Sequence, residues 1–343
     1  MPDSVPLPRI ALTLGDVTGI GPEIVARAVT DDRLRGSCRP IVVGAPEVLQ
    51  RALKLVDQSA TIMTVESPDN IDWSVSSIPC WNPSNIQVAD LPVGRIDGRA
   101  GQAAYDYLVG STRAALAGRL DAITTAPLNK AALHAAGLNY PGHTEILAKE
   151  CGITEFAMML YLPPGEPVAG LHGLGVAHVT LHTSIASVPG LLTVTHITET
   201  IQLVDGFLKQ IGCKTPRVGV CALNPHGGEG GLFGTEEITT ITPAVDAARQ
   251  MGIDAIGPIP ADALLRRAVS GEFDGVAAMY HDQGHIALKL IGFEQAVNVT
   301  LGLPIVRTSP SHGTAFDIAW QGKARATGFF EAVRTAAALA RHS

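Results

Sequence analysis

Three histidines each follow a stretch that predicts a buried strand, and together they could hold a metal ion. The strands are expected at residues 176–181, 218–223 and 274–280, and the histidines are His182, His226 and His281. Open α/β sheets bind their ligands just beyond the carboxyl ends of their strands. Three imidazoles form the ligand set of a catalytic divalent metal that keeps an open position for substrate. The alternative is three unrelated histidines among the 11 in the chain. A metal site requires a fold that brings the three together, within one subunit or across two.

Ionisable residues near these histidines predict further chemistry. Asp282 follows His281 directly, where it could orient the imidazole or act as a base. Lys289, Asn298 and Arg307 come next along the chain and are expected on neighbouring strands. Lysine and arginine can hold a phosphate, and asparagine can orient it. The alternative is that the two cations are ordinary surface charges.

The elements that must position these residues alternate between strands and helices. A strand at 10–14 runs into a glycine turn from Gly15 to Glu23, and a helix begins at Pro22. Such a turn can receive an anion or a nucleotide. It matches neither G-x-G-x-x-G nor the Walker pattern, so a plain tight turn is the alternative. Long helices are expected at 188–211 and 235–251, and the glycine-rich loop 224–231 lets a ligand approach the backbone closely.

Length and composition predict a globular protein of two domains. The chain has 343 residues, of which 46% are hydrophobic and 17% charged, so it exceeds the usual size of one core and is not expected to be disordered. The net charge of −7, with scattered basic residues, argues against nucleic acid and membrane surfaces as partners. The five cysteines include no C-x-x-C pair. With no signal peptide and no bilayer-spanning apolar run in sight, we expect a cytoplasmic protein.

The sequence resembles the 4-hydroxythreonine-4-phosphate dehydrogenase family, of pyridoxal phosphate biosynthesis, over nearly the whole chain. The resemblance lies in several sequence blocks that occur in the family's order. The matching blocks are GDVTGIGPE (15–23), TAPLNK (125–130), GHTE (142–145), LNPHGGEGG (223–231), PAD (260–262), MYHDQGH (279–285), NVTLGLPIVRTS (298–309) and HGTAFDIA (312–319). The first and last blocks are also distantly similar to isopropylmalate and isocitrate dehydrogenases. The chain departs from the family's common pattern at Val17-Thr18, where Pro-Ala is usual, and at Leu181, where Thr-Thr-His is usual.

The resemblance implies a fold and an assembly. The fold would be the two-domain α/β/α type of the isocitrate and isopropylmalate dehydrogenases, with the active site in the interdomain cleft. Residues 1–128 and 290–343 would form a first domain on the NAD side. Residues 129–289 would form a second domain, which carries the metal ligands and the interface of a homodimer.

The resemblance also implies a role for each site residue. A divalent metal would be held by His182 and His226 of one subunit and His281 of the other. Histidine ligands suit zinc, cobalt or nickel, and magnesium or manganese stay open. Beside the resemblance, we take Asp262 and Asp282 as candidates for orienting a ligand histidine or relaying the proton. The substrate would contact a set of polar residues, namely His143, Thr144, Lys289, Asn298 and Arg307. NAD or NADP would contact the last block, at His312, Gly313, Thr314 and Asp317.

The implied activity is the NAD-dependent oxidation of 4-phosphooxy-L-threonine to 2-amino-3-oxo-4-phosphooxybutanoate, which decarboxylates to 3-amino-2-oxopropyl phosphate in pyridoxine 5'-phosphate biosynthesis. Two alternatives stay open. One is a dehydrogenase of a related substrate, such as D-threonate or D-erythronate 4-phosphate or a carboxylated cyclic diol. The other is a metabolite-binding protein without catalysis, although a degenerate site should have lost some of its histidines or cations.

Overall fold

The computed structural model describes residues 6–154 and 156–341. They divide into two compact units, one of residues 6–154 and 303–341 and the other of residues 156–302. The chain therefore leaves the first unit once and returns to it. Residues 129–154 pack with the first unit and residues 290–302 with the second, whereas the resemblance places both segments in the opposite domain. The functional assignment of the two domains stays a prediction.

The first unit is built on parallel strands in the order β3-β4-β2-β1-β5-β12. Central positions such as Leu12, which pairs with Val42 and with Thr124, are fully buried. Near-continuous apolar runs are typical of parallel strands because helices cover both of their faces. The strands are β1 Arg9–Thr13, β2 Arg39–Val43, β3 Ile62–Val65, β4 Ile78–Trp81, β5 Ala122–Thr125 and β12 Val306–Pro310.

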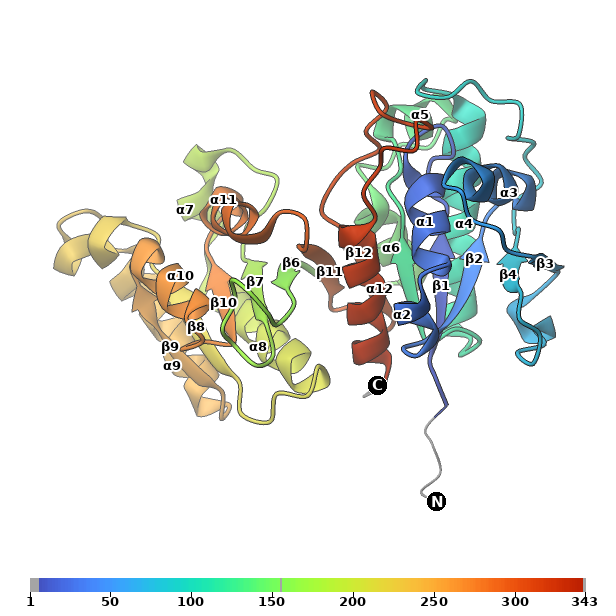
Figure 1. Cartoon of the computed structure of the whole chain (residues 1–343). Coiled ribbons are helices and arrows are strands. Elements are labelled where there is room, and N and C mark those ends of the chain that lie inside the picture. Colours follow the sequence, from blue (N-terminus) through green and yellow to red (C-terminus); the bar gives the residue numbers. More distant parts are fainter. Residues whose placement is uncertain (1–5, 155, 342–343) are drawn as a thin grey trace, which may run out of the picture. The chain divides into compact units, whose positions relative to one another are not determined.

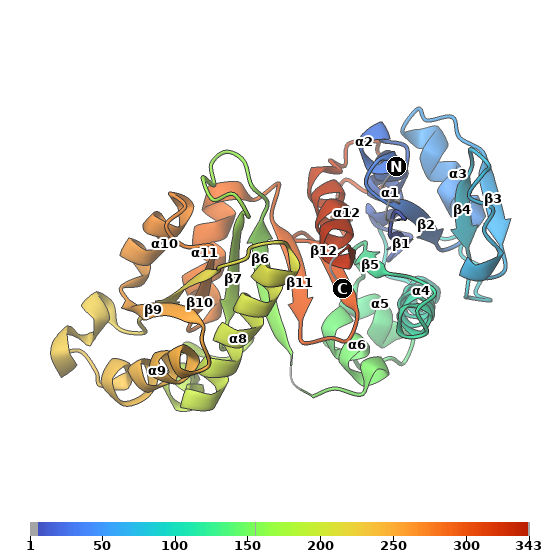
Figure 2. The ribbon, with the colours of Figure 1, turned by 90° about the horizontal axis from the view of Figure 1, so that it is seen from below.

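Two groups of helices cover this sheet. In Figures 1 and 2, α1, α2, α3 and α12 lie on one face and α4, α5 and α6 on the other, and the contacts between elements agree. The bounds are α1 Gly21–Val29, α2 Asp32–Arg35, α3 Pro46–Leu55, α4 Gly98–Leu116, α5 Lys130–Ala135, α6 His143–Cys151 and α12 Thr327–Ala340, with a 3-10 turn at Pro68–Asn70. The helix expected at Pro22 thus begins one residue earlier, with the proline in its first turn, where its missing N–H costs nothing.

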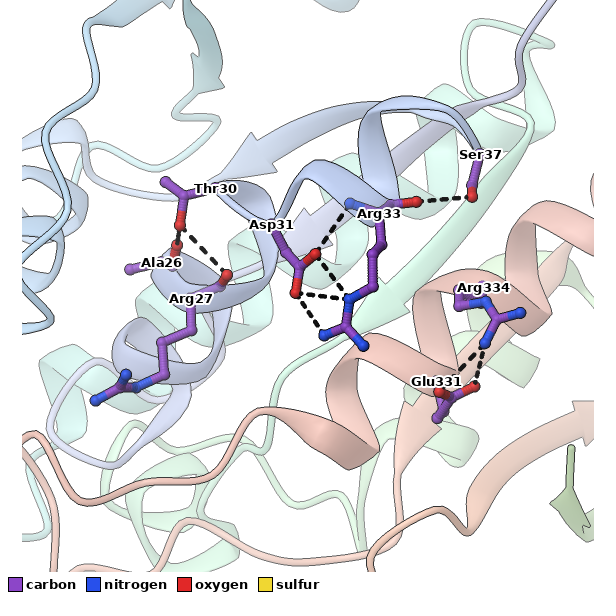
Figure 3. A network of polar contacts seen from close by, with 8 residues as sticks. All are labelled: Ala26, Arg27, Thr30, Asp31, Arg33, Ser37, Glu331 and Arg334. Carbon is purple, nitrogen blue, oxygen red and sulfur yellow. Dashed lines mark hydrogen bonds and ion pairs between the residues drawn. The ribbon is translucent and has the colours of Figure 1, made fainter. Parts of the chain in front are cut away.

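Side-chain caps hold the junction between α1 and α2 (Figure 3). Thr30 Oγ1 donates to the carbonyl of Ala26 at 2.9 Å, and Asp31 caps α2 by accepting from the N–H of Arg33 at 2.9 Å. The Arg33 guanidinium also pairs with Asp31 at 2.6 Å. An aspartate at this position satisfies a helix N–H that has no partner within the helix. The network ends α1 and starts α2, and it contains none of the expected site residues.

The second unit has strands in the order β11-β6-β7-β10-β8-β9. The pairs β11-β6 and β6-β7 are antiparallel, and β7-β10, β10-β8 and β8-β9 are parallel. Helices α8 and α9 cover one face and α10 and α11 the other (Figure 2). The strands are β6 Ala157–Leu162, β7 Leu174–His178, β8 Arg217–Cys221, β9 Asp254–Ile259, β10 Gly275–Ala278 and β11 Val297–Leu301. The helices are α7 Val188–Leu191, α8 Val194–Gln210, α9 Thr242–Gln250, α10 Ala261–Val269 and α11 His281–Gly292, with further turns at Ile185–Ser187, Pro225–Gly231 and Glu237–Ile241.

Several expectations for this unit need correction. The helix expected at 188–211 is broken, because Leu192 is extended and Thr193 caps α8 by accepting from the N–H of His196 at 3.1 Å. The helix expected at 235–251 begins with a π-helical turn before α9. Lys289 was expected on a strand but lies on α11. In the described part of the chain, no helix is long and apolar enough to cross a membrane.

Candidate metal and substrate site

His281 opens α11 directly after β10 and is held by its neighbour. Its Nδ1 lies 2.6 Å from Oδ1 of Asp282. An ionised carboxylate only accepts hydrogen bonds, so Nδ1 carries the proton and Nε2 keeps a free lone pair. A carboxylate that accepts from one ring nitrogen in this way orients the imidazole so that its other nitrogen can bind a metal. Nε2 of His281 is therefore the atom available to a metal.

His182 lies beside His281. The rings have centroids 6.0 Å apart, and both line a hollow of about 460 Å³ together with Tyr280 and Asp282. The strand expected to end at Leu181 ends at His178. His182 therefore follows an irregular segment, in which Thr180 Oγ1 donates to the carbonyl of Met279 at 2.8 Å. This bond holds the segment that carries His182 to the end of β10.

His226 lines a different hollow, of about 530 Å³, whose wall also includes Asp262, Tyr280 and Asp282. Within one chain, the described residues contain no group of three His, Cys, Asp or Glu side chains placed to hold a metal ion. The structure thus brings His182 and His281 together, and it places His226 with Asp262. All three imidazoles reach the surface, and their nitrogens suit zinc, cobalt or nickel. These donors fit a metal site to which a second chain contributes the missing ligand.

Two further histidines lie behind His281. The ring of His285 stacks on that of His281, with centroids 3.8 Å apart, and its Nδ1 lies 3.1 Å from Nε2 of His178. Nδ1 of His178 faces the carbonyl of Met158 at 3.3 Å and must donate to it, so His178 Nε2 accepts from His285. Burial lowers the pKa of His178 to about 4 and that of His285 to about 3. Both rings are therefore neutral at pH 7.

Neither histidine of this buried pair was expected to have a role. One signal was present, because residues four apart, such as His281 and His285, share one face of a helix. His178 had no comparable signal. It reaches His285 only through the pairing of β7 with β10, where it lies opposite Ala278.

The first unit contains a buried arginine that was expected to contact the substrate. Arg307, on β12, is 2% exposed, and its Nη2 donates to Thr125 Oγ1 at 2.7 Å. Burial lowers its pKa to about 10, partly offset by the charge of Glu145, so it stays cationic at pH 7. Burial, and then the charge of Arg307, lower the pKa of His143 well below its usual value. The neutral His143 and Thr144 open α6, which follows Gly142 in the capping position.

The other two expected substrate residues belong to the second unit. Lys289 is on α11 and Asn298 is on β11. Oδ1 of Asn298 is buried and has no hydrogen-bond partner in the described part of the chain. A buried amide oxygen without a partner costs free energy, which a bound donor group would recover.

The expected cofactor loop packs against the glycine turn of the first unit. The N–H of Ile20 donates to the carbonyl of Thr314 at 3.0 Å, and a Cβ on Gly19 would come within 2.9 Å of the same oxygen. His312 Nδ1 donates to the carbonyl of Gly313 at 3.1 Å. Its Nε2 is buried and unpaired among the described residues, and burial lowers its pKa. His312 thus presents a neutral acceptor, whereas Gly313 and Asp317 are exposed. The loop fits a ligand with an N–H or O–H donor, such as a nucleotide.

The chain matches the family of the pyridoxal phosphate biosynthetic protein PdxA over residues 36–336. It belongs to the PdxA family. A 4-hydroxythreonine-4-phosphate dehydrogenase of Geobacter metallireducens is 45% identical over 97% of this chain and 96% of its own length. A D-threonate 4-phosphate dehydrogenase of Cupriavidus necator is 43% identical over 97% of this chain and 98% of its own.

Solved PdxA structures share the fold. A 4-hydroxythreonine-4-phosphate dehydrogenase from Klebsiella pneumoniae matches with a TM-score of 0.84 and 40% identity, covering 97% of this chain and 99% of that one. The family expected from the sequence blocks, the two-domain α/β fold and the dehydrogenase class are confirmed. The roles of individual PdxA site residues in this chain stay predictions.

Proposed function

We propose that the chain is a metal-dependent, NAD(P)-linked dehydrogenase that oxidises the C3 hydroxyl of 4-phosphooxy-L-threonine. The product, 2-amino-3-oxo-4-phosphooxybutanoate, loses carbon dioxide to give 3-amino-2-oxopropyl phosphate for pyridoxine 5'-phosphate biosynthesis. One observation carries the proposal, namely that Asp282 orients His281 and leaves its Nε2 free. Membership of a family whose relatives are named dehydrogenases supports it.

A second substrate is favoured by the relatives, because one of comparable identity is named a D-threonate 4-phosphate dehydrogenase. That compound shares the carboxylate, the C3 hydroxyl and the phosphate, and it carries a hydroxyl in place of the C2 amine. Arg307 and the metal residues would serve both compounds equally. D-erythronate 4-phosphate, a carboxylated cyclic diol and a role in binding without catalysis rank below these two.

The metal would be held by His182 and His226 of one subunit and His281 of the other, in a homodimer. Within one chain His182 lies beside His281, and His226 lines the neighbouring hollow, so the three do not form a complete site in one chain. The division of the three ligands between two subunits rests on the family resemblance. When bound, the divalent metal and NAD supply a Lewis acid at the hydroxyl oxygen and an acceptor for hydride. Zinc, cobalt, magnesium and manganese remain candidates.

The chain's own residues would bind and orient the substrate and move its proton. Arg307, Lys289 and the neutral His143 would hold the phosphate away from the reacting carbon, so that binding energy fixes orientation. Thr144 and Asn298 would hydrogen-bond the polar substrate. Asp282 would keep Nδ1 of His281 protonated, and the exposed Asp262 would accept the hydroxyl proton and pass it to water.

The cofactor would lie along His312, Gly313, Thr314 and Asp317, with the buried Nε2 of His312 accepting a hydrogen bond from it. We propose the cytoplasm as the location, supported by five cysteines that are all free thiols.

The test is NADH formation by chelator-treated protein given 4-phosphooxy-L-threonine and NAD, with and without added divalent metal. Metal-dependent formation supports the proposal. Formation with D-threonate 4-phosphate alone keeps the chemistry and changes the substrate. If protein that binds metal tightly turns over neither compound, the proposal that the chain is a dehydrogenase is wrong.

A further inference from the structure

We propose that Glu237 is a positioning residue for His226, because its buried carboxylate fixes the loop that carries this imidazole. The inference rests on the metal role proposed above for His226. It assigns no contact between Glu237 and the metal or the substrate.

The loop around His226 has a backbone that needs outside support. His226 and the four residues after it all have positive φ, at 53°, 68°, 75°, 48° and 65°. This region is unfavourable for side-chain-bearing residues such as His226 and Glu229. The three glycines adopt it freely, but His226 and Glu229 hold it only where the surroundings over-determine it.

Glu237 supplies that support from the start of the π-helical turn Glu237–Ile241. It is 3% exposed, and its Oε1 accepts from the N–H groups of Leu223 at 2.8 Å and Asn224 at 2.7 Å. Its Oε2 accepts from Nδ2 of Asn224 at 2.9 Å. The three donors belong to Leu223 and Asn224, which lie three and two residues before His226. The carboxylate therefore fixes the residues from which the loop departs.

The same carboxylate also packs against the returning side of the loop. A Cβ on Gly228 would come within 2.6 Å of Glu237 Oε2. Glu237 therefore bonds the chain before His226, at residues 223–224, and lies close to Gly228 after it, where a side chain would not fit. Only an ionised carboxylate offers two oxygens to three donors. A glutamine would replace one oxygen by an N–H₂ group that faces the donating amide of Asn224.

The chain offers two matched controls. Glu236 also accepts from Nδ2 of Asn224, at 2.8 Å, but it is less buried than Glu237. It does not accept from the backbone N–H of Leu223 or Asn224, as Glu237 does. Gly227 has φ 68°, close to that of Gly228, yet a Cβ there would meet nothing within 4 Å. Comparing Glu237→Gln with Glu236→Gln, and Gly228→Ala with Gly227→Ala, separates the carboxylate's role from general damage to the loop.

The experiment is a Co²⁺ titration of the chelator-treated full-length chain, followed by visible absorption. The spectrum reports both affinity and ligand geometry. We expect Glu237→Gln to weaken Co²⁺ binding by about 10- to 100-fold and to change the spectrum, with Glu236→Gln within about twofold of wild type. Gly228→Ala should lose more affinity than Gly227→Ala.

Wild-type affinity and spectrum in a folded Glu237→Gln would overturn the positioning role. If Glu237→Gln fails to fold, the glycine pair decides, and equal loss in both alanine variants rejects the proposal. His226→Ala tests the underlying assumption. If its Co²⁺ affinity equals that of wild type, His226 is not a ligand, and the proposed metal site fails independently of any result at Glu237.

Discussion

The Nδ1 atom of His281 lies 2.6 Å from Oδ1 of Asp282, the next residue in the chain. This contact fixes the tautomer of His281, so its loss should reduce metal affinity. We expect Asp282→Ala to weaken Co²⁺ or Zn²⁺ binding by about 10- to 100-fold. Asp282→Asn should lose less, because an amide oxygen still accepts from Nδ1. The exposed Asp254 provides the control, and an equal loss in Asp254→Ala would show that the effect is not specific.

The proposed sharing of the metal site between subunits predicts complementation. His182→Ala and His281→Ala should each abolish activity as homodimers. In mixed dimers of the two variants, one site would carry both defects and the other would be intact. Co-expression should therefore restore activity, up to roughly one quarter of wild type for random pairing. A site built within one chain would give no recovery.

Arg307 should act through the substrate phosphate. We expect Arg307→Lys to raise KM for the phosphorylated substrate by about 10- to 100-fold, because lysine cannot form the planar paired hydrogen bonds and a charged hydrogen bond is lost. The control is the same substrate without its phosphate, for which the two proteins should differ little. A similar loss for both substrates would place Arg307 outside the phosphate site.

The buried His178 should make stability depend on pH. Its folded pKa, about 4, lies below the ordinary value of 6.5, so the unfolded chain binds a proton that the folded chain excludes. Stability is therefore full above pH 6.5 and falls as the pH drops toward 4. Between pH 7 and pH 5 the loss from this group is about 2 kcal/mol. Urea unfolding of metal-free wild type and His178→Gln at both pH values should show a smaller decline in the variant; equal declines would contradict the assignment.

The contact between Gly19 and Thr314 predicts an effect on the cofactor. A Cβ at residue 19 would lie 2.9 Å from the carbonyl oxygen of Thr314 and displace the loop 312–317. We expect Gly19→Ala to raise KM for NAD by about tenfold, the scale of one lost hydrogen bond, with KM for the hydroxy acid unchanged. Gly36, where a Cβ would meet nothing within 4 Å, is the matched control. A rise in both KM values would instead indicate general damage.

The sequence by itself determined the local elements and the local chemistry. The helix expected to begin at Pro22 begins at Gly21, and the strand expected at 218–223 agrees within two residues with β8, Arg217–Cys221. Such elements can be predicted because apolar periodicity, and the prolines and glycines at element ends, determine the local conformation over a few residues. The Asp282–His281 pair was predictable for the same reason, since its members are adjacent.

Tertiary structure decided which distant residues meet. His178 and His285 are 107 residues apart, and their contact depends on the register of β7 against β10 and on the packing of α11. Glu237 reaches Leu223 because a π-helical turn follows the His226 loop, and no periodicity in the sequence marks that turn. The break at Leu192 was not predicted because the cap of Thr193 starts a new helix within an apolar pattern that continues through it. The helical position of Lys289 was not predicted because α11 is set by the packing of its buried face. Hydrogen bonds between segments distant in the chain depend on packing, which local sequence patterns do not encode.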